Sequence, residues 1–144
     1  MSRIYSLQDA DAILPEIEVI VQRLQAFRDA VIGLRDAYRL GGGVGDAEGR
    51  EARRPAEAGV DARAERERIR LRLRGVVDQM QADAAWLDAR DIALRDIATG
   101  LLDFPGEHRG QPIWLCWRLG EDSVAWWHPQ SEGFAGRRPV DELG

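Results

Sequence analysis

The spacing of apolar residues along this chain changes from three or four to two near residue 89. Large apolar side chains recur every third or fourth position over residues 6–40 and 60–90, which predicts two long amphipathic helices. Over residues 91–140 they alternate with other residues or follow turn signals, which is typical of short strands. The sequence therefore predicts an α+β fold, in which a long antiparallel helical hairpin precedes a small antiparallel sheet of three or four strands. We expect residues 1–144 to form a single domain.

Two features of the helical region modify this expectation. Proline cannot donate to the carbonyl four residues earlier, so we expect the first helix to break near Pro15. Residues 41–59 are rich in glycine, alanine and charged residues, which predicts a flexible connector. The run GGGVGD inside it lacks the lysine and the Ser/Thr of a phosphate-binding P-loop, so we interpret it as linker.

The strands of the C-terminal third are expected at residues 92–94, 101–104, 113–119 and 124–128. Pro105-Gly106 should end the second strand, and residues 120–122 should form the hairpin turn between the last two. One register of that hairpin places Leu115 opposite His128. A slip of one residue instead pairs Trp114 with His128 and Cys116 with Trp126, which makes a better pocket with Arg118 on the same side.

The composition of the chain argues against a secreted disulfide-bonded protein, a membrane protein and a general polyanion binder. The chain has 144 residues, one cysteine and a net charge of −5, so it has no internal disulfide and little general affinity for polyanions. No run of eighteen apolar residues and no signal-peptide pattern occurs, so we expect a soluble, cytoplasmic protein without membrane contact. A stripe of arginines on the second helix, Arg63, Arg66, Arg70 and Arg74, is a minor argument for nucleic-acid binding.

Five short motifs stand out in the sequence: YSLQDADAILPEI near the N-terminus and, in the C-terminal third, LLDFP, GQPIWLCWRLGE, WWH and GFAGRRP. Together they resemble the prokaryotic family catalogued as domain of unknown function 2203. The resemblance implies a helical hairpin with an appended small sheet. It implies no activity, so the function has to be sought in the residues themselves.

The candidate ligand-binding residues gather in the tryptophan-rich last third. Histidine changes charge near neutral pH, and arginine binds carboxylate or phosphate at two points. The glycine-flanked segment GFAGRRP, residues 133–139, could close an anion site against the sheet. The candidates are His128, Arg118, Arg137, Arg138, Asp103, Glu121, Trp114 and Trp126.

The sequence supports a catalytic site or a metal site less well than it supports an anion site. Cys116 lies in the middle of an expected strand, where a cysteine is usually buried and inert. His108 and His128 have no partner ligand three or four residues away, so we expect no metal and no cofactor. A metal site would have to be assembled through space from Asp103, Glu121 and one histidine.

Two functions therefore remain open. The first, which the sequence favours, is a non-catalytic interaction or scaffold protein that forms a homo-oligomer, such as a dimer, through its helical hairpin. The apolar stripes of the long helices are wider than one hairpin seam requires, and a second copy would cover them. The alternative is a protein, and possibly an enzyme, that binds a small anion or metabolite between the sheet and residues 133–139.

Overall fold

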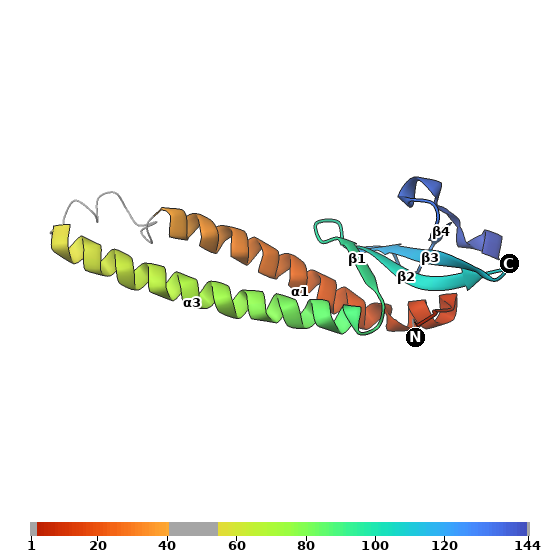
Figure 1. The fold of residues 1–144 in the computed structure, drawn as a ribbon, viewed down its shortest axis with the longest axis horizontal. Helices are drawn as coiled ribbons and strands as arrows, with labels where there is room; N and C mark the ends of the chain where they lie inside the picture. The colour runs from red at the N-terminus through yellow and green to blue at the C-terminus, as the bar shows by residue number, and fades with distance from the viewer. Residues whose placement is uncertain (1–2, 41–54, 144) are drawn as a thin grey trace. The chain divides into compact units, whose positions relative to one another are not determined.

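The computed structural model describes residues 3–40 and 55–143, without the side chains of residues 55–58 and Phe134. Two long helices precede a five-stranded antiparallel sheet, which confirms the α+β prediction (Figure 1). The elements are α1 (Leu7–Arg39), α3 (Pro55–Asp88), β1 (Ala93–Asp96), β2 (Leu101–His108), β3 (Gln111–Arg118), β4 (Trp126–Pro129), η1 (Phe134–Gly136), β5 (Arg138–Pro139) and η2 (Val140–Leu143). The connector expected at residues 41–59 falls mostly outside the described residues.

Helix α1 begins after a reciprocal cap. The Asp9 N–H donates to Ser6 Oγ at 3.0 Å, and the Ser6 N–H donates to Asp9 Oδ2 at 3.4 Å. The predicted break near Pro15 is wrong, because α1 continues through this residue. Pro15 is exposed, so the carbonyl of Asp11 that loses its helical partner lies on the solvent side, where water can satisfy it.

Helix α3 begins earlier than the sequence predicted, at Pro55 instead of residue 60. A proline in the first turn needs no helical donor and has a helical φ, so it suits this start. At the other end the chain leaves the helix through Asp91, whose φ is 60°, and the Ile92 N–H donates to Leu87 O at 3.1 Å. This C-terminal turn directs the chain from α3 into β1.

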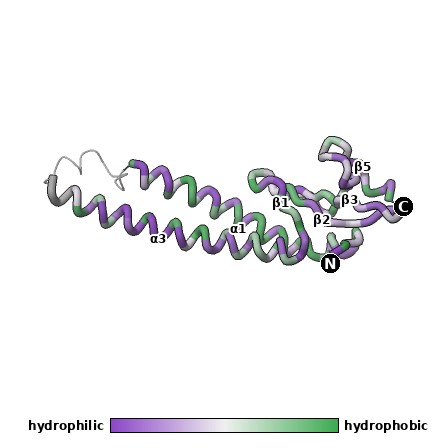
Figure 2. Tube along the Cα trace, in the orientation of Figure 1, coloured by the Kyte–Doolittle hydropathy of each residue, from purple (hydrophilic) through white to green (hydrophobic). Residues whose placement is uncertain are grey.

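The structure contains two compact units: residues 1–25 with 82–144, here the sheet unit, and residues 26–81, here the hairpin unit. In the hairpin unit the apolar residues of α1 and α3 follow a helical repeat between polar ones (Figure 2). Among its described residues only Ile69 is buried. The hairpin unit thus has a much thinner core than the sheet unit.

The sheet has the order β1-β2-β3-β4-β5 with every neighbouring pair antiparallel, so it has five strands where three or four were expected. The additional strand is the two-residue β5. Strand β2 also runs past Pro105, where we expected it to end. The Pro105 carbonyl accepts the Tyr5 N–H at 2.8 Å, away from β3, so the proline nitrogen faces the same edge and no β2–β3 hydrogen bond is lost.

The register of β3 and β4 follows the second alignment considered above, with Trp114 opposite His128 and Cys116 opposite Trp126. Because side chains alternate across a sheet, this register gives the two faces different chemistry. The inner face carries Leu102, Phe104, Ile113, Leu115, Trp117 and Trp127, all buried. The outer face carries Asp103, Pro105, Trp114, Cys116, Arg118, Trp126 and His128.

The N-terminal half of α1 supplies the apolar cover of the inner face. The Tyr5 ring packs edge-on against Phe104 with centroids 5.3 Å apart. The Val124 N–H, just before β4, donates to Asp11 Oδ1 at 2.8 Å. The helical side of this layer consists of the buried residues Ala10, Leu14, Ile17, Ile20, Val21 and Leu24. No helix among the described residues is long and apolar enough to cross a membrane.

Candidate functional site

Three buried side chains that can bind a cation or a proton meet on the outer face of the sheet. Asp103, Cys116 and His128 are 4%, 2% and 5% exposed. Asp103 and Cys116 are directly opposite in the β2–β3 pair, and His128 lies two positions along β4 from Trp126, the residue that faces Cys116. One ligand atom from each lies within 4.8 Å of the other two. We call this group the Asp103 cluster.

The two carboxylate oxygens of Asp103 differ in their surroundings. Oδ2 accepts a hydrogen bond from Arg95 Nε at 2.9 Å, an ion pair whose arginine side chain is 45% exposed. Oδ1 is buried and accepts no hydrogen bond from any described residue. Burying an acceptor oxygen without a hydrogen-bond donor lowers the stability of the folded state. The negative charge on Oδ1 is therefore only partly compensated by the described residues.

His128 is held in one tautomer by its own strand. Its Nδ1 lies 2.9 Å from the Pro129 carbonyl oxygen, which can only accept, so Nδ1 carries the proton of the neutral ring. Nε2 then carries the lone pair and faces Asp103 Oδ2 at 3.8 Å. This orientation is the one a metal-binding or proton-accepting imidazole requires.

Cys116 is buried, as its place in the strand predicted. Burial raises the pKa of the Cys116 thiol far above its usual range, and the Asp103 carboxylate raises it further, whereas the charges of Arg137 and Arg95 act in the opposite direction. The thiol is protonated and poorly nucleophilic without an additional cation.

Two arginine–tryptophan stacks flank the Asp103 cluster. The Arg95 guanidinium lies 4.8 Å from the centre of a ring of Trp114, and that of Arg137 lies 4.9 Å from Trp126. Both distances fall within the range of cation–π attraction. The stacks place two guanidinium groups on the same face as the buried carboxylate.

The remaining predicted site residues do not join the Asp103 cluster. Arg118 is exposed at the end of β3, and its N–H donates to Glu121 Oε1 at 2.9 Å. Glu121 belongs to the turn, where its carbonyl also accepts the Trp117 Nε1–H at 2.9 Å. Arg138 stacks on Trp127 at 5.5 Å, on the other face of the sheet from the Arg137 stack. The sequence reasoning missed Arg95, and it set Cys116 aside as inert.

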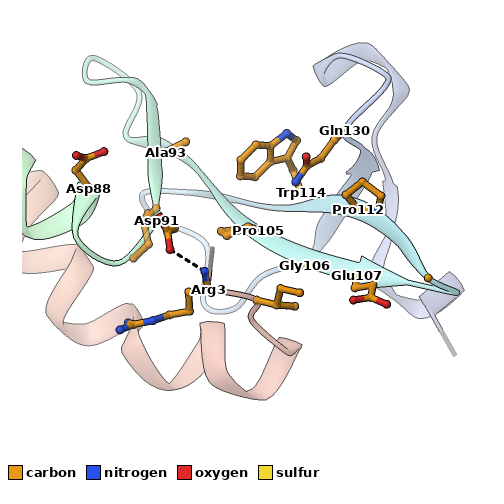
Figure 3. Close-up of a pocket in the computed structure, with 13 residues that line it drawn as sticks. Arg3, Asp88, Asp91, Ala93, Pro105, Gly106, Glu107, Pro112, Trp114 and Gln130 are labelled. Atoms are coloured by element: carbon orange, nitrogen blue, oxygen red, sulfur yellow. Dashed lines mark hydrogen bonds between the residues drawn. The ribbon is translucent and has the colours of Figure 1, made fainter. Parts of the chain in front are cut away.

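A cavity of about 500 Å³ opens beside Trp114 and is lined by acids (Figure 3). Asp88, Asp91 and Glu107 line it together with a single arginine, Arg3. The Arg3 N–H donates to Asp91 Oδ2 at 2.7 Å, as the dashed line shows. Trp114 alone of the predicted site residues lines this acidic cavity, which does not suit an anion.

A cavity of about 470 Å³ lies between the sheet and the C-terminal segment. Arg109, Arg138 and His108 line it with one acid, Glu142, and with the indole of Trp127. The His108 and Trp127 rings are 5.3 Å apart. We call it the arginine cavity; of the predicted residues it contains Arg138, and neither His128 nor Arg137 lines it.

Two of the four arginines of the α3 stripe, Arg66 and Arg70, make local contacts. Arg70 donates to Glu67 Oε1 at 2.7 Å, and Arg66 lies 5.9 Å from the centre of the Tyr38 ring. The neighbouring Arg68 pairs with Glu65 in the same way. These i,i+3 pairs are typical of a solvated helix surface, which weakens the nucleic-acid alternative.

A family model described as "Uncharacterized conserved protein (DUF2203)" matches residues 3–140. Neither the curated proteins nor the solved structures contain a significant match to the chain.

Proposed function

Because the chain belongs to the DUF2203 family of uncharacterized conserved proteins, whose description names no activity, we propose its function from its own geometry. It is a binding protein for a small anion, which is held in the arginine cavity without a catalysed step. The observation that carries this proposal is the composition of the cavity lining, which contains Arg109, Arg138, Trp127 and a single acid, Glu142. The sequence predicts an anion site between the sheet and residues 133–139 as its alternative function, and of the residues predicted for that site only Arg138 lines this cavity.

The two arginines reach the cavity for separate structural reasons. Arg138 belongs to β5, and its guanidinium stacks on Trp127. Arg109 occupies the β2–β3 hairpin turn with a φ of 52°, followed by Gly110 at 78°. Both values are left-handed, as in the tight turns that join adjacent antiparallel strands.

The chemistry of the lining suits a carboxylate or phosphate. Guanidinium groups present paired N–H donors to such anions, and the Ser131 side chain adds a hydroxyl. Trp127, Ile113 and Pro129 form apolar walls that would cover the rest of a ligand. A volume of about 470 Å³ is within the ordinary range of metabolite pockets. A cytoplasmic location belongs to this proposal, since a single reduced cysteine suits a reducing compartment.

Calorimetric titration with inorganic phosphate, succinate and adenosine monophosphate tests the proposal. We expect at least one of these probes to bind, and Arg138→Gln or Arg109→Gln to weaken it about tenfold or more, because a hydrogen bond to a charged group contributes roughly 1.5–3 kcal/mol. Arg137→Gln is the matched control, since the neighbouring side chain lies over Trp126 on the other face. Equal losses in all three variants, or no binding at millimolar concentration, would reject the arginine cavity as an anion site.

Self-association is a second candidate function, supported by the thin core of the hairpin unit. Of the residues of this unit that the structure describes, only Ile69 is buried. The apolar positions between its two helices, Phe27, Val31, Leu34, Leu73, Val76 and Met80, are only half-buried. A second copy packed as a helical bundle would cover them.

Sedimentation equilibrium at micromolar concentration measures the mass directly. We expect twice the chain mass of 16.1 kDa, and Val76→Asn should shift the equilibrium toward monomer more than Val77→Asn, one position away from the seam. A monomer with full helical content would contradict the dimer and leave the anion proposal unaffected.

A further inference from the structure

We propose that Asp103, Cys116 and His128 bind one divalent transition-metal ion on the outer face of the sheet, with Zn²⁺ the best match. The inference goes beyond the anion-binding proposal and does not rest on it, because the Asp103 cluster and the arginine cavity have no lining residue in common. The sequence predicted no metal, since these ligands are far apart in the chain.

The set of donors selects the class of ion. A thiolate, an imidazole nitrogen and a carboxylate oxygen are the three ligand types that Zn²⁺ takes in proteins. The hard ions Mg²⁺ and Ca²⁺ prefer oxygen ligands, and a cysteine–histidine pair does not favour them. The Asp103 cluster therefore fits a borderline-soft divalent ion.

Two acceptor atoms of the cluster already face each other, because His128 Nε2 lies 3.8 Å from Asp103 Oδ2. Asp103 Oδ1 is buried without a donor among the described residues, while Oδ2 is held by Arg95 at 2.9 Å. The bond from His128 Nδ1 to the Pro129 carbonyl leaves the Nε2 lone pair on the side of Asp103. A carbonyl partner of this kind commonly orients a metal-binding histidine. A cation between these atoms would remove the acceptor–acceptor contact.

The distances need only a small adjustment. The three ligand atoms lie within 4.8 Å of one another. In a tetrahedral zinc site with bonds of about 2.0–2.3 Å, ligand atoms are separated by roughly 3.3–3.7 Å. A contraction of roughly 1 Å is within the reach of side-chain rotation on adjacent strands.

Charge and coordination number lead to the same kind of site. Binding displaces the Cys116 thiol proton to solvent, so the thiolate and the Asp103 carboxylate balance the two charges of the ion, and nothing is oxidised or reduced. Three protein ligands leave the fourth position to water or to a ligand, as in open rather than structural zinc sites. Arg95 and Arg137 stand on either side, and both side chains are exposed.

The test uses the full chain, stripped with a chelator and titrated with Co²⁺ as a spectroscopic substitute for Zn²⁺. We expect one Co²⁺ per chain, a thiolate-to-cobalt charge-transfer band, and release of one proton per ion at pH 7. Cys116→Ser should abolish the band, and His128→Gln and Asp103→Asn should weaken binding at least tenfold. His108→Gln is the matched control, because it removes the other histidine of the chain and should change neither the band nor the affinity.

Far-ultraviolet circular dichroism establishes which variants fold. If a variant does not fold, the stoichiometry, band and proton release of the unmodified chain still decide the matter. Absence of binding at micromolar Co²⁺, binding without the thiolate band, or loss of binding in the His108→Gln variant would overturn the proposal.

Discussion

Asp103 and His128 are both almost fully buried, yet Oδ2 of the first and Nε2 of the second are 3.8 Å apart, too far for a hydrogen bond. Each is instead fixed by another group: Arg95 holds the carboxylate, and the Pro129 carbonyl holds the imidazole. The sheet therefore fixes the positions of the two side chains, but it gives neither His128 Nε2 nor Asp103 Oδ1 a hydrogen-bond partner among the described residues. Buried polar groups in this condition are expected at functional sites more than in structural cores.

Removal of Arg95 should destabilise the sheet unit. Arg95→Ala leaves the buried Asp103 carboxylate without its ion-pair partner, and because the arginine is half-exposed we expect a loss of about 2 kcal/mol, less than for a fully buried pair. Urea unfolding of the metal-free chain measures this loss. Arg118→Ala, which changes an exposed arginine on the same face, should cost less than about 0.5 kcal/mol. Similar losses for the two variants would show that the Arg95–Asp103 pair contributes little.

The buried thiol should make stability fall in alkaline solution. The pKa of Cys116 is raised in the folded chain, so below the unfolded value of about 8.5 both states hold the proton, and above it only the unfolded state releases it. The free energy of unfolding should therefore decrease by about 1 kcal/mol between pH 8.5 and 9.5, measured in chelator.

The control for this pH dependence is Cys116→Ala. The alanine variant is less stable at every pH because of the cavity it leaves, but its stability should be almost flat over the same interval. The chain has no lysine, so few other groups titrate there. A wild-type profile as flat as that of the variant would show that the thiol pKa is close to normal in the folded state.

Gly100 should be far less tolerant of substitution than Gly110. Both have positive φ, 70° and 78°, but a Cβ at Gly100 would lie 2.6 Å from Leu119 Cβ and 3.0 Å from Val21 Cγ1, whereas none of the described atoms is near at Gly110. Gly110→Ala should cost about 1 kcal/mol for the backbone conformation alone. Gly100→Ala should cost about 2–4 kcal/mol, because overpacking is added. Thermal unfolding of the two variants compares them, and equal Tm values would contradict the close packing at Gly100.

The contact between Asp11 and Val124 should be important for docking α1 on the sheet. Asp11→Ala removes the acceptor of the Val124 N–H, which lies in a residue only 2% exposed, so we expect a loss of about 1–3 kcal/mol. Glu18→Ala, on the exposed side of α1, should stay within about 0.5 kcal/mol. Hydrogen exchange at Val124 checks the mechanism, because it should accelerate in the Asp11 variant and stay slow in the Glu18 variant.

The helices and the existence of the sheet could be predicted because apolar residues recur every three or four positions in the helices and alternate in the strands. The Pro15 break could not, because a proline on the exposed side of a long helix costs one hydrogen bond that water replaces. Strand β2 was cut short at Pro105 for a similar reason: the edge toward Tyr5 needs no proline donor. The two-residue β5 has too few positions for any periodicity.

The sequence indicated several of the residues that belong to the candidate site, but it could not indicate which of them lie next to one another. Asp103, His128, Trp114, Trp126 and Arg137 were named, and the structure brings them to one face. Which of them share a face depends on a single-residue register of β3 and β4, and the sequence left both registers open. Arg95 lies within an irregularity of β1, between Leu94 and Asp96, which hydrophobic alternation does not reveal.

Strand β5 is only two residues long. Its register nevertheless determines that Arg138 lies on the face of the arginine cavity and Arg137 on the opposite face, over Trp126. Its position rests on two anchors, the Trp127 Nε1–H donated to Pro139 O and the Val140 N–H donated to Ala125 O, at 3.1 Å and 3.0 Å. A shift by one position would send Arg137 toward the cavity and Arg138 toward the buried acid. An insertion or deletion ahead of this strand would thus exchange the electrostatic environments of two sites without altering a single charge.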